Sequence, residues 1–135
     1  SAGYANWCEV MQVNVNAQFV LTRYLLPLLQ LAPRASIVLT SSSVGRTGRA
    51  YWGAYAVSKF ATEGFMQLLA DELENTSNSR VTSLNPRGTR TAMRRAAYPA
   101  ENPANNPPPE EIMPAYLFLM GEDSAGITGK AFDAR

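Results

Sequence analysis

The chain has 135 residues, of which 46% are hydrophobic and 10% aromatic, a composition typical of one modest globular domain rather than a disordered segment. Twelve basic residues against eleven acidic ones leave a net charge of +1, which argues against a nucleic-acid-binding surface or a basic membrane-binding patch. Histidine is absent, so imidazole bases and histidine metal sites are excluded, no metal site is expected, and acid–base chemistry must use Tyr, Lys, Asp or Glu.

The first predicted element is a long helix from about Ala5 to Leu31. Its apolar residues recur at steps of three and four, as one buried helix stripe requires. They are Trp7, Val10, Met11, Val15, Phe19, Tyr24, Leu25, Leu28 and Leu29. Pro33 closes this segment. The run ASIVLTSSS at residues 35–43 follows, and its continuous apolar start predicts a strand buried on both faces of a parallel sheet.

A loop with three glycines precedes a second helix, predicted from Tyr55 to Glu74 by the same periodicity. A second strand is predicted at residues 80–85 (RVTSLN), which Pro86 stops. The segment from Arg94 to Glu111 is rich in Pro, Asn and Ala, which predicts a mobile loop.

The last two predicted elements are a short apolar helix at residues 112–120 and a strand within residues 125–134. The order helix, strand, helix, strand, loop, helix, strand predicts an α/β fold with parallel strands and right-handed crossovers. Three strands are few for a parallel sheet, because helices must cover both faces of such a sheet. At least one more strand is expected ahead of the first helix, so residues 1–135 are interpreted as a single partial domain.

Tyr55 and Lys59 are four residues apart and therefore lie on one face of the second helix, about one turn from each other. An ammonium about 4 Å from a phenol in a partly shielded site stabilises the phenolate by roughly 4 kcal/mol. That is enough to make a tyrosine usable as a general acid or base. The same spacing arises where an aromatic ring covers a lysine stem on a helix surface, so the pair alone leaves both interpretations open.

Hydroxyl side chains gather at the end of the first predicted strand, at Thr40, Ser41, Ser42 and Ser43. Open α/β sheets bind their ligands at the carboxyl ends of the strands, so a hydroxyl there could hold a substrate carbonyl. Strand-end capping and turn formation account equally well for any one of these serines.

Four motifs occur in order along the chain: NVNAQF, then TSSSVG followed by YAVSK with twelve residues between Ser42 and Tyr55, then NPRGTRT, and finally ITGKAFDA. They resemble the helix asparagine, the Ser and Tyr-x-x-x-Lys signature, the Pro-Gly-x-x-x-Thr segment and the last strand of the short-chain dehydrogenase/reductase family. The resemblance covers essentially the whole chain, but only the C-terminal half, or slightly more, of a family member. It implies a Rossmann-type doubly wound parallel sheet without its N-terminal strands.

The resemblance implies an oxidoreductase that transfers hydride between a nicotinamide cofactor and a carbonyl or secondary alcohol. By matching position, Tyr55 is the acid–base residue, and Lys59 assists it and hydrogen-bonds the nicotinamide ribose. Ser42 matches the substrate-orienting serine, with Ser41 and Ser43 as near misses. The segment from Arg94 to Glu111 is expected to act as a lid over the substrate.

The helix asparagine of the family falls on Asn14. In the family this residue interrupts the local helix ladder and holds a water of a proton relay behind the lysine. A polar residue on an exposed helix stripe is the other interpretation of Asn14, and Asn16 is the neighbour most easily mistaken for it.

The cofactor is expected to be NAD or NADP, with NADP favoured. The segment Pro86 to Thr91 matches the piece that lies along the nicotinamide end, and the implied contacts, besides Tyr55 and Lys59, are Pro86, Gly88, Thr89 and Thr91. Arg87 replaces the usual glycine of the family. A side chain limits access to positive φ, so the sequence leaves open the local backbone conformation at Arg87 and how closely the cofactor approaches this backbone.

The sequence contains no Gly-x-x-x-Gly-x-Gly turn of the kind that grips a pyrophosphate, so the isolated 135 residues are expected to be inactive. One alternative is an epimerase or dehydratase of the extended branch, which uses hydride transfer transiently. Another is a non-catalytic fragment that acts only in subunit contacts. In the family two long helices join the subunits, which implies a homodimer or homotetramer.

No targeting or membrane-spanning pattern is found in the sequence. No apolar run reaches the ~18 residues of a spanning helix, and the first ten residues lack the basic start and apolar stretch of a signal peptide. Cys8 is the one cysteine, which excludes an internal disulfide and favours a reducing compartment. A cytoplasmic protein with a small-molecule substrate and no nucleic-acid or membrane partner is expected.

Overall fold

The computed structural model describes residues 3–89 and 91–134. The elements in chain order are α1 (Tyr4–Met11), the π-helical turn η1 (Gln12–Asn16), α2 (Ala17–Leu29), β1 (Ala35–Thr40), the 3-10 turn η2 (Ser43–Gly45), α3 (Gly53–Glu74), β2 (Ser79–Asn85), α4 (Ala92–Ala97), the 3-10 turn η3 (Pro103–Asn105), α5 (Pro109–Met120), the 3-10 turn η4 (Glu122–Ser124) and β3 (Lys130–Asp133).

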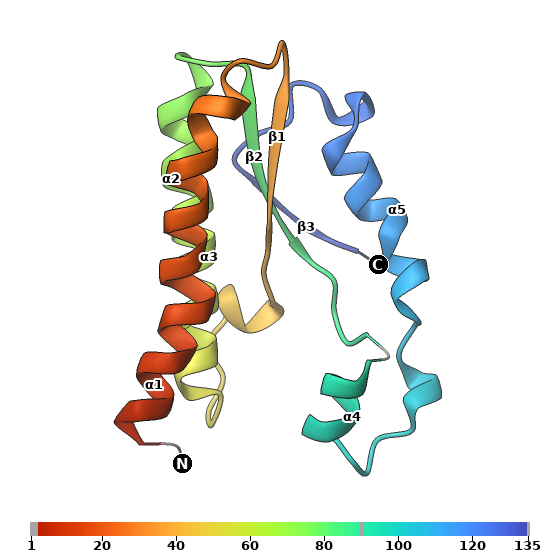
Figure 1. Ribbon diagram of the computed structural model, residues 1–135. Helices are drawn as coiled ribbons and strands as arrows, with labels where there is room; N and C mark the ends of the chain where they lie inside the picture. The colour runs from red at the N-terminus through yellow and green to blue at the C-terminus, as the bar shows by residue number, and fades with distance from the viewer. Residues whose placement is uncertain (1–2, 90, 135) are drawn as a thin grey trace.

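The three strands form one parallel sheet in the order β1–β2–β3. β1 pairs with β2 from Ala35 opposite Ser79 onward, and β2 pairs with β3 from Thr82 opposite Lys130 onward. Helices α1, α2 and α3 lie on one side of the sheet and α5 on the other (Figure 1). The predicted α/β fold with parallel strands is confirmed.

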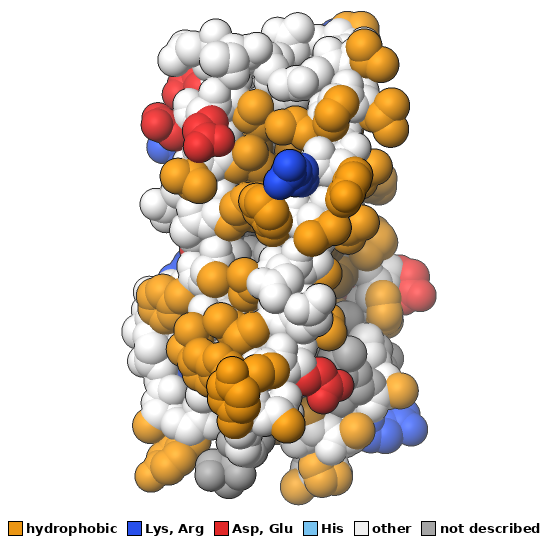
Figure 2. All heavy atoms as spheres, turned by 60° about the vertical axis from the view of Figure 1, so that its left-hand side comes forward, with side chains coloured by type: hydrophobic (Ala, Val, Ile, Leu, Met, Phe, Trp, Pro, Cys, Tyr) orange, Lys and Arg blue, Asp and Glu red, His pale blue; other side chains and the backbone are white. Residues whose placement is uncertain are grey.

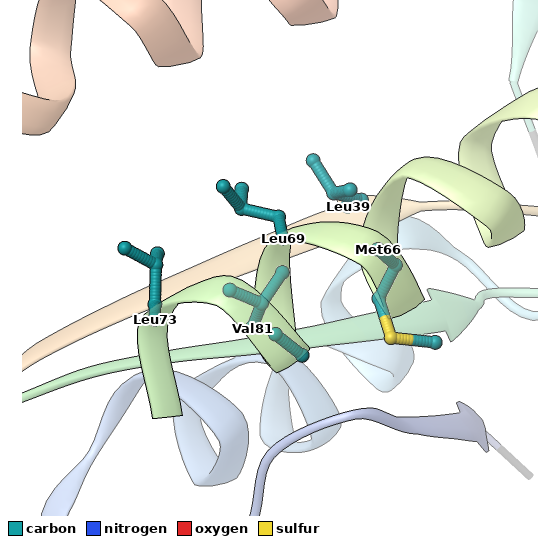
Figure 3. Packing of buried hydrophobic residues seen from close by; sticks show 6 residues of the cluster. Leu39, Met66, Leu69, Leu73 and Val81 are labelled. Atoms are coloured by element: carbon teal, nitrogen blue, oxygen red, sulfur yellow. The ribbon is translucent and has the colours of Figure 1, made fainter. Parts of the chain in front are cut away.

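The main core lies between α3 and the strands β1 and β2. Met66, Leu69 and Leu73 recur at steps of three and four on α3 and form one cluster with Leu39 of β1 and Val81 of β2 (Figure 3). Each of these side chains is at most 7% exposed, and full burial of such a side chain contributes about 1.5–3 kcal/mol. This packing fixes α3, and therefore every side chain on it, relative to the carboxyl ends of β1 and β2.

The first predicted helix exists, but its apolar stripe is not buried. α1, η1 and α2 follow one another without a break, yet none of their described residues is buried, because α3 rather than α1 or α2 covers the sheet. Leu26 is the α2 residue that packs against the core cluster. The prediction of a buried stripe was therefore wrong for this chain, and its side chains form part of an exposed apolar face (Figure 2). No helix of the described part of the chain is long and apolar enough to cross a bilayer.

The predicted burial of β1 on both faces is also wrong. Only Ala35 and Leu39 are buried on this strand, because α3 packs mainly on β2, and no described strand pairs with the outer edge of β1.

The segment predicted as a mobile loop contains regular structure. α4 ends at Ala97, η3 covers Pro103–Asn105, and α5 begins at Pro109, earlier than the predicted start at residue 112. Proline at the first helical position and the acidic pair Glu110 and Glu111 in the first turn favour this earlier start. The proline content therefore limits the length of the helices rather than abolishing them.

Candidate active site

The turn that carries Ser42 packs directly against the helix that carries Tyr55 and Lys59. A Cβ added at Gly45, in η2, would lie 2.7 Å from the carbonyl oxygen of Lys59, so only a glycine allows this approach of the two backbones. Ser42 is the N-cap of η2 and is the second residue after the carboxyl end of β1. The contact brings the serine turn and the Tyr-x-x-x-Lys turn together at one edge of the sheet.

Tyr55 and Lys59 face each other. The Lys59 Nζ lies 5.6 Å from the centroid of the Tyr55 ring and donates a hydrogen bond to the carbonyl oxygen of Thr40 at 3.2 Å. Lys59 is 9% exposed, whereas Tyr55 is 38% exposed, so the ammonium lies beneath a phenol that is open to solvent. Burial lowers the pKa of Lys59 below its usual value, because the ammonium has lost part of its hydration.

The three neighbouring serines differ in their surroundings. Ser41 is buried, and its hydroxyl donates to the Glu63 carboxylate at 2.5 Å, so its proton is not available for a hydrogen bond to a ligand. Ser43 is exposed. Ser42 is half-buried, and its Oγ accepts a long hydrogen bond of 3.4 Å from the Val44 amide, which leaves its proton able to point toward a ligand.

Asn14 lies in the π-helical turn η1, where the regular helix ladder is interrupted. Its Nδ2 donates to Ser58 Oγ at 3.1 Å, and Ser58 Oγ donates to the Tyr55 carbonyl oxygen at 2.6 Å. Asn14 is therefore linked to the backbone of the tyrosine turn. Asn16 instead donates to Gln12 Oε1 at 2.8 Å on the exposed surface, so the two asparagines are clearly distinguished.

The segment Pro86 to Thr91 begins at the carboxyl end of β2, which is the neighbour of β1 in the sheet. A Cβ on Gly88 would lie 2.5 Å from Asn106 Oδ1, so the chain passes this side chain closely. The Thr89 hydroxyl donates to the Arg87 carbonyl oxygen at 3.1 Å, and the Thr91 hydroxyl accepts the Arg94 amide at 3.1 Å as the N-cap of α4.

Arg87 adopts a backbone conformation that glycine reaches more readily than other residues. Its φ is +63°, in the left-handed region, despite the side chain. The Arg87 amide donates to Asn85 Oδ1 at 2.9 Å, a local bond that helps to hold this conformation. The local backbone conformation that the sequence left open is therefore left-handed, despite the side chain.

Replacing Arg87 by glycine is expected to stabilise the protein by up to about 1 kcal/mol. A non-glycine residue in the left-handed region costs roughly 1–2 kcal/mol, and glycine removes this cost. Two smaller effects oppose the gain: glycine loses more backbone entropy on folding, and the variant lacks the weak ion pair with Asp133. The measurement is the urea midpoint of the complete protein at constant m-value. Arg87→Ala is the control, because it removes the guanidinium but keeps the strain; an equal gain from alanine would contradict this explanation.

Two hollows lie near these elements. One of about 540 Å³ runs between η1, α2 and α3, away from Tyr55, and is lined by residues that include Val15, Phe19 and Phe65. The other, of about 240 Å³, adjoins α4 and is lined by residues that include Thr91 and Arg94.

An ion pair orders the wall of the smaller hollow. Arg94 donates to both carboxylate oxygens of Glu101 at 2.9 Å, and Asn106 donates to the same carboxylate at 2.7 Å. The guanidinium also lies 4.0 Å from the centroid of the Tyr98 ring. The hydrogen bond from Arg94 lowers the pKa of Glu101, despite an opposing effect of burial. The segment predicted as a lid is therefore held by specific contacts.

Glu63 is a buried carboxylate that the sequence interpretation missed. It follows Lys59 by one more helical turn and is 6% exposed. Its two oxygens accept from Ser41 at 2.5 Å and from Ser83 at 2.6 Å, and Arg46 Nε donates to it at 3.3 Å. A charged residue within the inward-facing stripe of α3 was the signal that could have identified it.

Comparisons with known proteins identify the family of the chain. Residues 2–102 match the model of the short chain dehydrogenase family. The chain is 60% identical to the uncharacterized oxidoreductase YciK of Escherichia coli (strain K12) over 129 residues, which are 96% of this chain and 50% of that protein.

Two solved structures show the same fold. A short chain dehydrogenase from Pseudomonas syringae superimposes with a TM-score of 0.95 at 63% identity, over 98% of this chain and 54% of that chain. One from Shigella flexneri 2a, complexed with NADP, gives a TM-score of 0.95 at 57% identity, over 99% of this chain and 55% of that chain. The chain thus spans about half the length of the relatives it matches. On its sequence, its fold and these matches, the chain belongs to the short-chain dehydrogenase family.

Proposed function

We propose that the chain is the catalytic C-terminal half of a larger NAD(P)-dependent oxidoreductase that interconverts a carbonyl and a secondary alcohol. The observation that carries this proposal is the contact of Lys59 with Tyr55 and with the carbonyl oxygen of Thr40, the last residue of β1, at the carboxyl edge of a parallel sheet. In particular, the Lys59 Nζ is 5.6 Å from the centroid of the Tyr55 ring. Open α/β sheets bind nucleotides at this edge.

The side chains at this edge fit a nicotinamide dinucleotide. The Lys59 ammonium has three donors, of which one is directed to the Thr40 carbonyl oxygen, so others remain for ribose hydroxyls. The segment Pro86 to Thr91 follows the neighbouring strand, with Gly88, Thr89 and Thr91 as proposed contacts. We propose NADP rather than NAD, supported by the NADP complex of the relative from Shigella flexneri.

In the proposed mechanism, bound nicotinamide supplies or accepts the hydride. In the reducing direction Tyr55 gives its phenolic proton to the carbonyl oxygen, and Ser42 donates a hydrogen bond to the same oxygen. The Lys59 ammonium stabilises the negative charge left on the phenol. Asn14 supports the turn that carries Tyr55 through Ser58. From its match to the family's helix asparagine, we propose that it also binds a water that returns a proton toward Lys59.

The complete protein is expected to oxidise NADPH in the presence of a carbonyl substrate, with one alcohol formed per cofactor consumed. The measurement is product analysis over a panel of aldehydes and ketones. An isomerised or dehydrated product without net cofactor turnover would instead support the epimerase or dehydratase alternative. The isolated 135 residues are expected to give no turnover, because they lack a glycine-rich turn for the pyrophosphate.

We further propose that the complete protein is a homodimer or homotetramer joined through its long helices. The support is the apolar face defined by the exposed large side chains of α1, η1, α2 and α3, seen in part in Figure 2. It includes Val13, Phe19, Leu21, Leu25 and Phe60. A non-catalytic role limited to such contacts does not account for the buried ammonium of Lys59 beside the ring of Tyr55.

A further inference from the structure

Glu63 connects α3 to both strands whose ends form the site. Ser41, which donates to one carboxylate oxygen, directly precedes Ser42, and Arg46, which donates to the same oxygen, follows the turn η2. The second oxygen accepts from Ser83 of β2. The residues immediately flanking the serine turn are therefore both fixed to the helix that carries Tyr55 and Lys59.

Arg46 extends this network toward β3 and the proposed cofactor segment. Its guanidinium donates to the Phe132 carbonyl oxygen at 2.9 Å and to Asp133 Oδ1 at 2.8 Å. Asp133 Oδ1 also accepts from Asn85 Nδ2 at 3.1 Å, and the Asn85 side chain accepts the Arg87 amide. All three strand ends thus connect to the Glu63 carboxylate through hydrogen bonds.

We propose that Glu63 is a positioning residue, which holds the Ser42 hydroxyl in register with the phenol of Tyr55. The inference rests on the proposed function. Tyr55, Lys59 and Glu63 are spaced by four residues each, so the carboxylate lies one helical turn behind the ammonium on the same side of α3. A displacement of about 1 Å at a catalytic group can lower a rate by about a hundredfold, so a turn held by one side chain affects turnover without touching substrate.

The test compares two serine variants of the complete protein that each remove one bond to the same carboxylate. Ser41 and Ser83 are both buried, and their bonds to Glu63 are 2.5 and 2.6 Å long. Ser41→Ala is expected to lower kcat roughly tenfold, with the KM for NADPH changed less than about twofold, because a bond to a charged group is lost beside Ser42. Ser83→Ala is expected to lower kcat by less than about twofold. The two variants are expected to lower the melting temperature by similar amounts, because each loses one buried hydrogen bond to the same carboxylate.

Glu63→Gln is expected to reproduce the kcat loss of Ser41→Ala, whereas Glu72→Gln, at an exposed position of the same helix, should leave kcat unchanged. Equal kcat losses from the two serine variants would overturn the proposal, as would melting temperatures that fall while kcat is unchanged throughout. Both results would leave the proposed function intact.

Hydrogen exchange separates this inference from the proposed function. The Gly45 amide donates to the Ser42 carbonyl oxygen, and the Arg46 and Thr47 amides donate to that of Ser43, so these three amides report the order of the serine turn. Exchange at these amides should accelerate roughly tenfold in Glu63→Gln relative to Glu72→Gln. Unchanged exchange would overturn the inference even if no substrate is turned over. Turnover that survives Tyr55→Phe would overturn the acid–base role of Tyr55, while accelerated exchange would still show that Glu63 orders the serine turn.

Discussion

Replacement of Tyr55 by phenylalanine in the complete protein is expected to lower kcat by about a thousandfold or more while leaving dinucleotide binding largely intact. Proton transfer by a positioned side chain contributes typically 10²–10⁴ to a rate, and the variant removes the group that transfers the proton. The ring remains, so its contact with Trp52, at 5.9 Å between centroids, and its contact with Lys59 Nζ, at 5.6 Å from the ring centroid, are retained. Because Tyr55 is 38% exposed, little change in stability is expected.

The measurement is steady-state kinetics with a substrate identified by product analysis, together with a calorimetric titration of NADPH. Tyr51→Phe is the matched control, because Tyr51 is fully exposed on the loop before α3 and should give kcat values near those of the wild type. Near-normal turnover of Tyr55→Phe would refute the assignment of the acid–base role. Loss of NADPH binding in the same variant would indicate that the Tyr55 hydroxyl binds the cofactor rather than transfers the proton.

Replacement of Lys59 by methionine is expected to lower kcat by about a hundredfold or more and to weaken NADPH binding. The variant removes the charge that stabilises the phenolate and the donors proposed for the ribose, while the unbranched side chain retains most of the volume. Lys130→Met is the control, because Lys130 lies exposed on β3 and has no proposed role. Turnover of Lys59→Met within about twofold of the wild type would contradict the role of the ammonium.

The same variant is expected to fold with no loss of stability at neutral pH. Burial lowers the pKa of Lys59 from 10.5, so the unfolded chain binds this proton more tightly than the folded one. The folded state therefore pays a free-energy penalty for the buried ammonium, which is fully present below the lowered pKa of the folded state. The penalty disappears as the pH rises from that pKa through 10.5, so the wild-type free energy of unfolding increases over this pH range.

Urea unfolding of the two proteins across that alkaline window measures the effect. The difference in unfolding free energy between Lys59→Met and the wild type should shrink as the pH rises toward 10.5. A difference that grows with pH would show that the ammonium stabilises the folded state. A lysine whose removal costs turnover but not stability is the pattern expected of a functional group.

Much of the fold followed from local sequence patterns. Apolar periodicity placed α3 and the continuous helix from α1 to α2, and Pro86 marked the end of β2. Burial was harder to predict, because the apolar stripe of α2 packs on little of the described chain, whereas α3 covers β1 and β2. Periodicity indicates which side of a helix is apolar but not what lies against it.

The sequence by itself determined that Tyr55 and Lys59 share a helix face, because helical spacing depends on nearby residues alone. The tertiary structure decided which serine hydroxyl remains available, since Ser41 is taken by Glu63, 22 positions away, and Ser42 is not. It also decided the left-handed backbone of Arg87 and the link from Arg46 to Asp133, 87 positions apart. Contacts of this range depend on strand register and helix packing, which bring together residues that no local spacing relates.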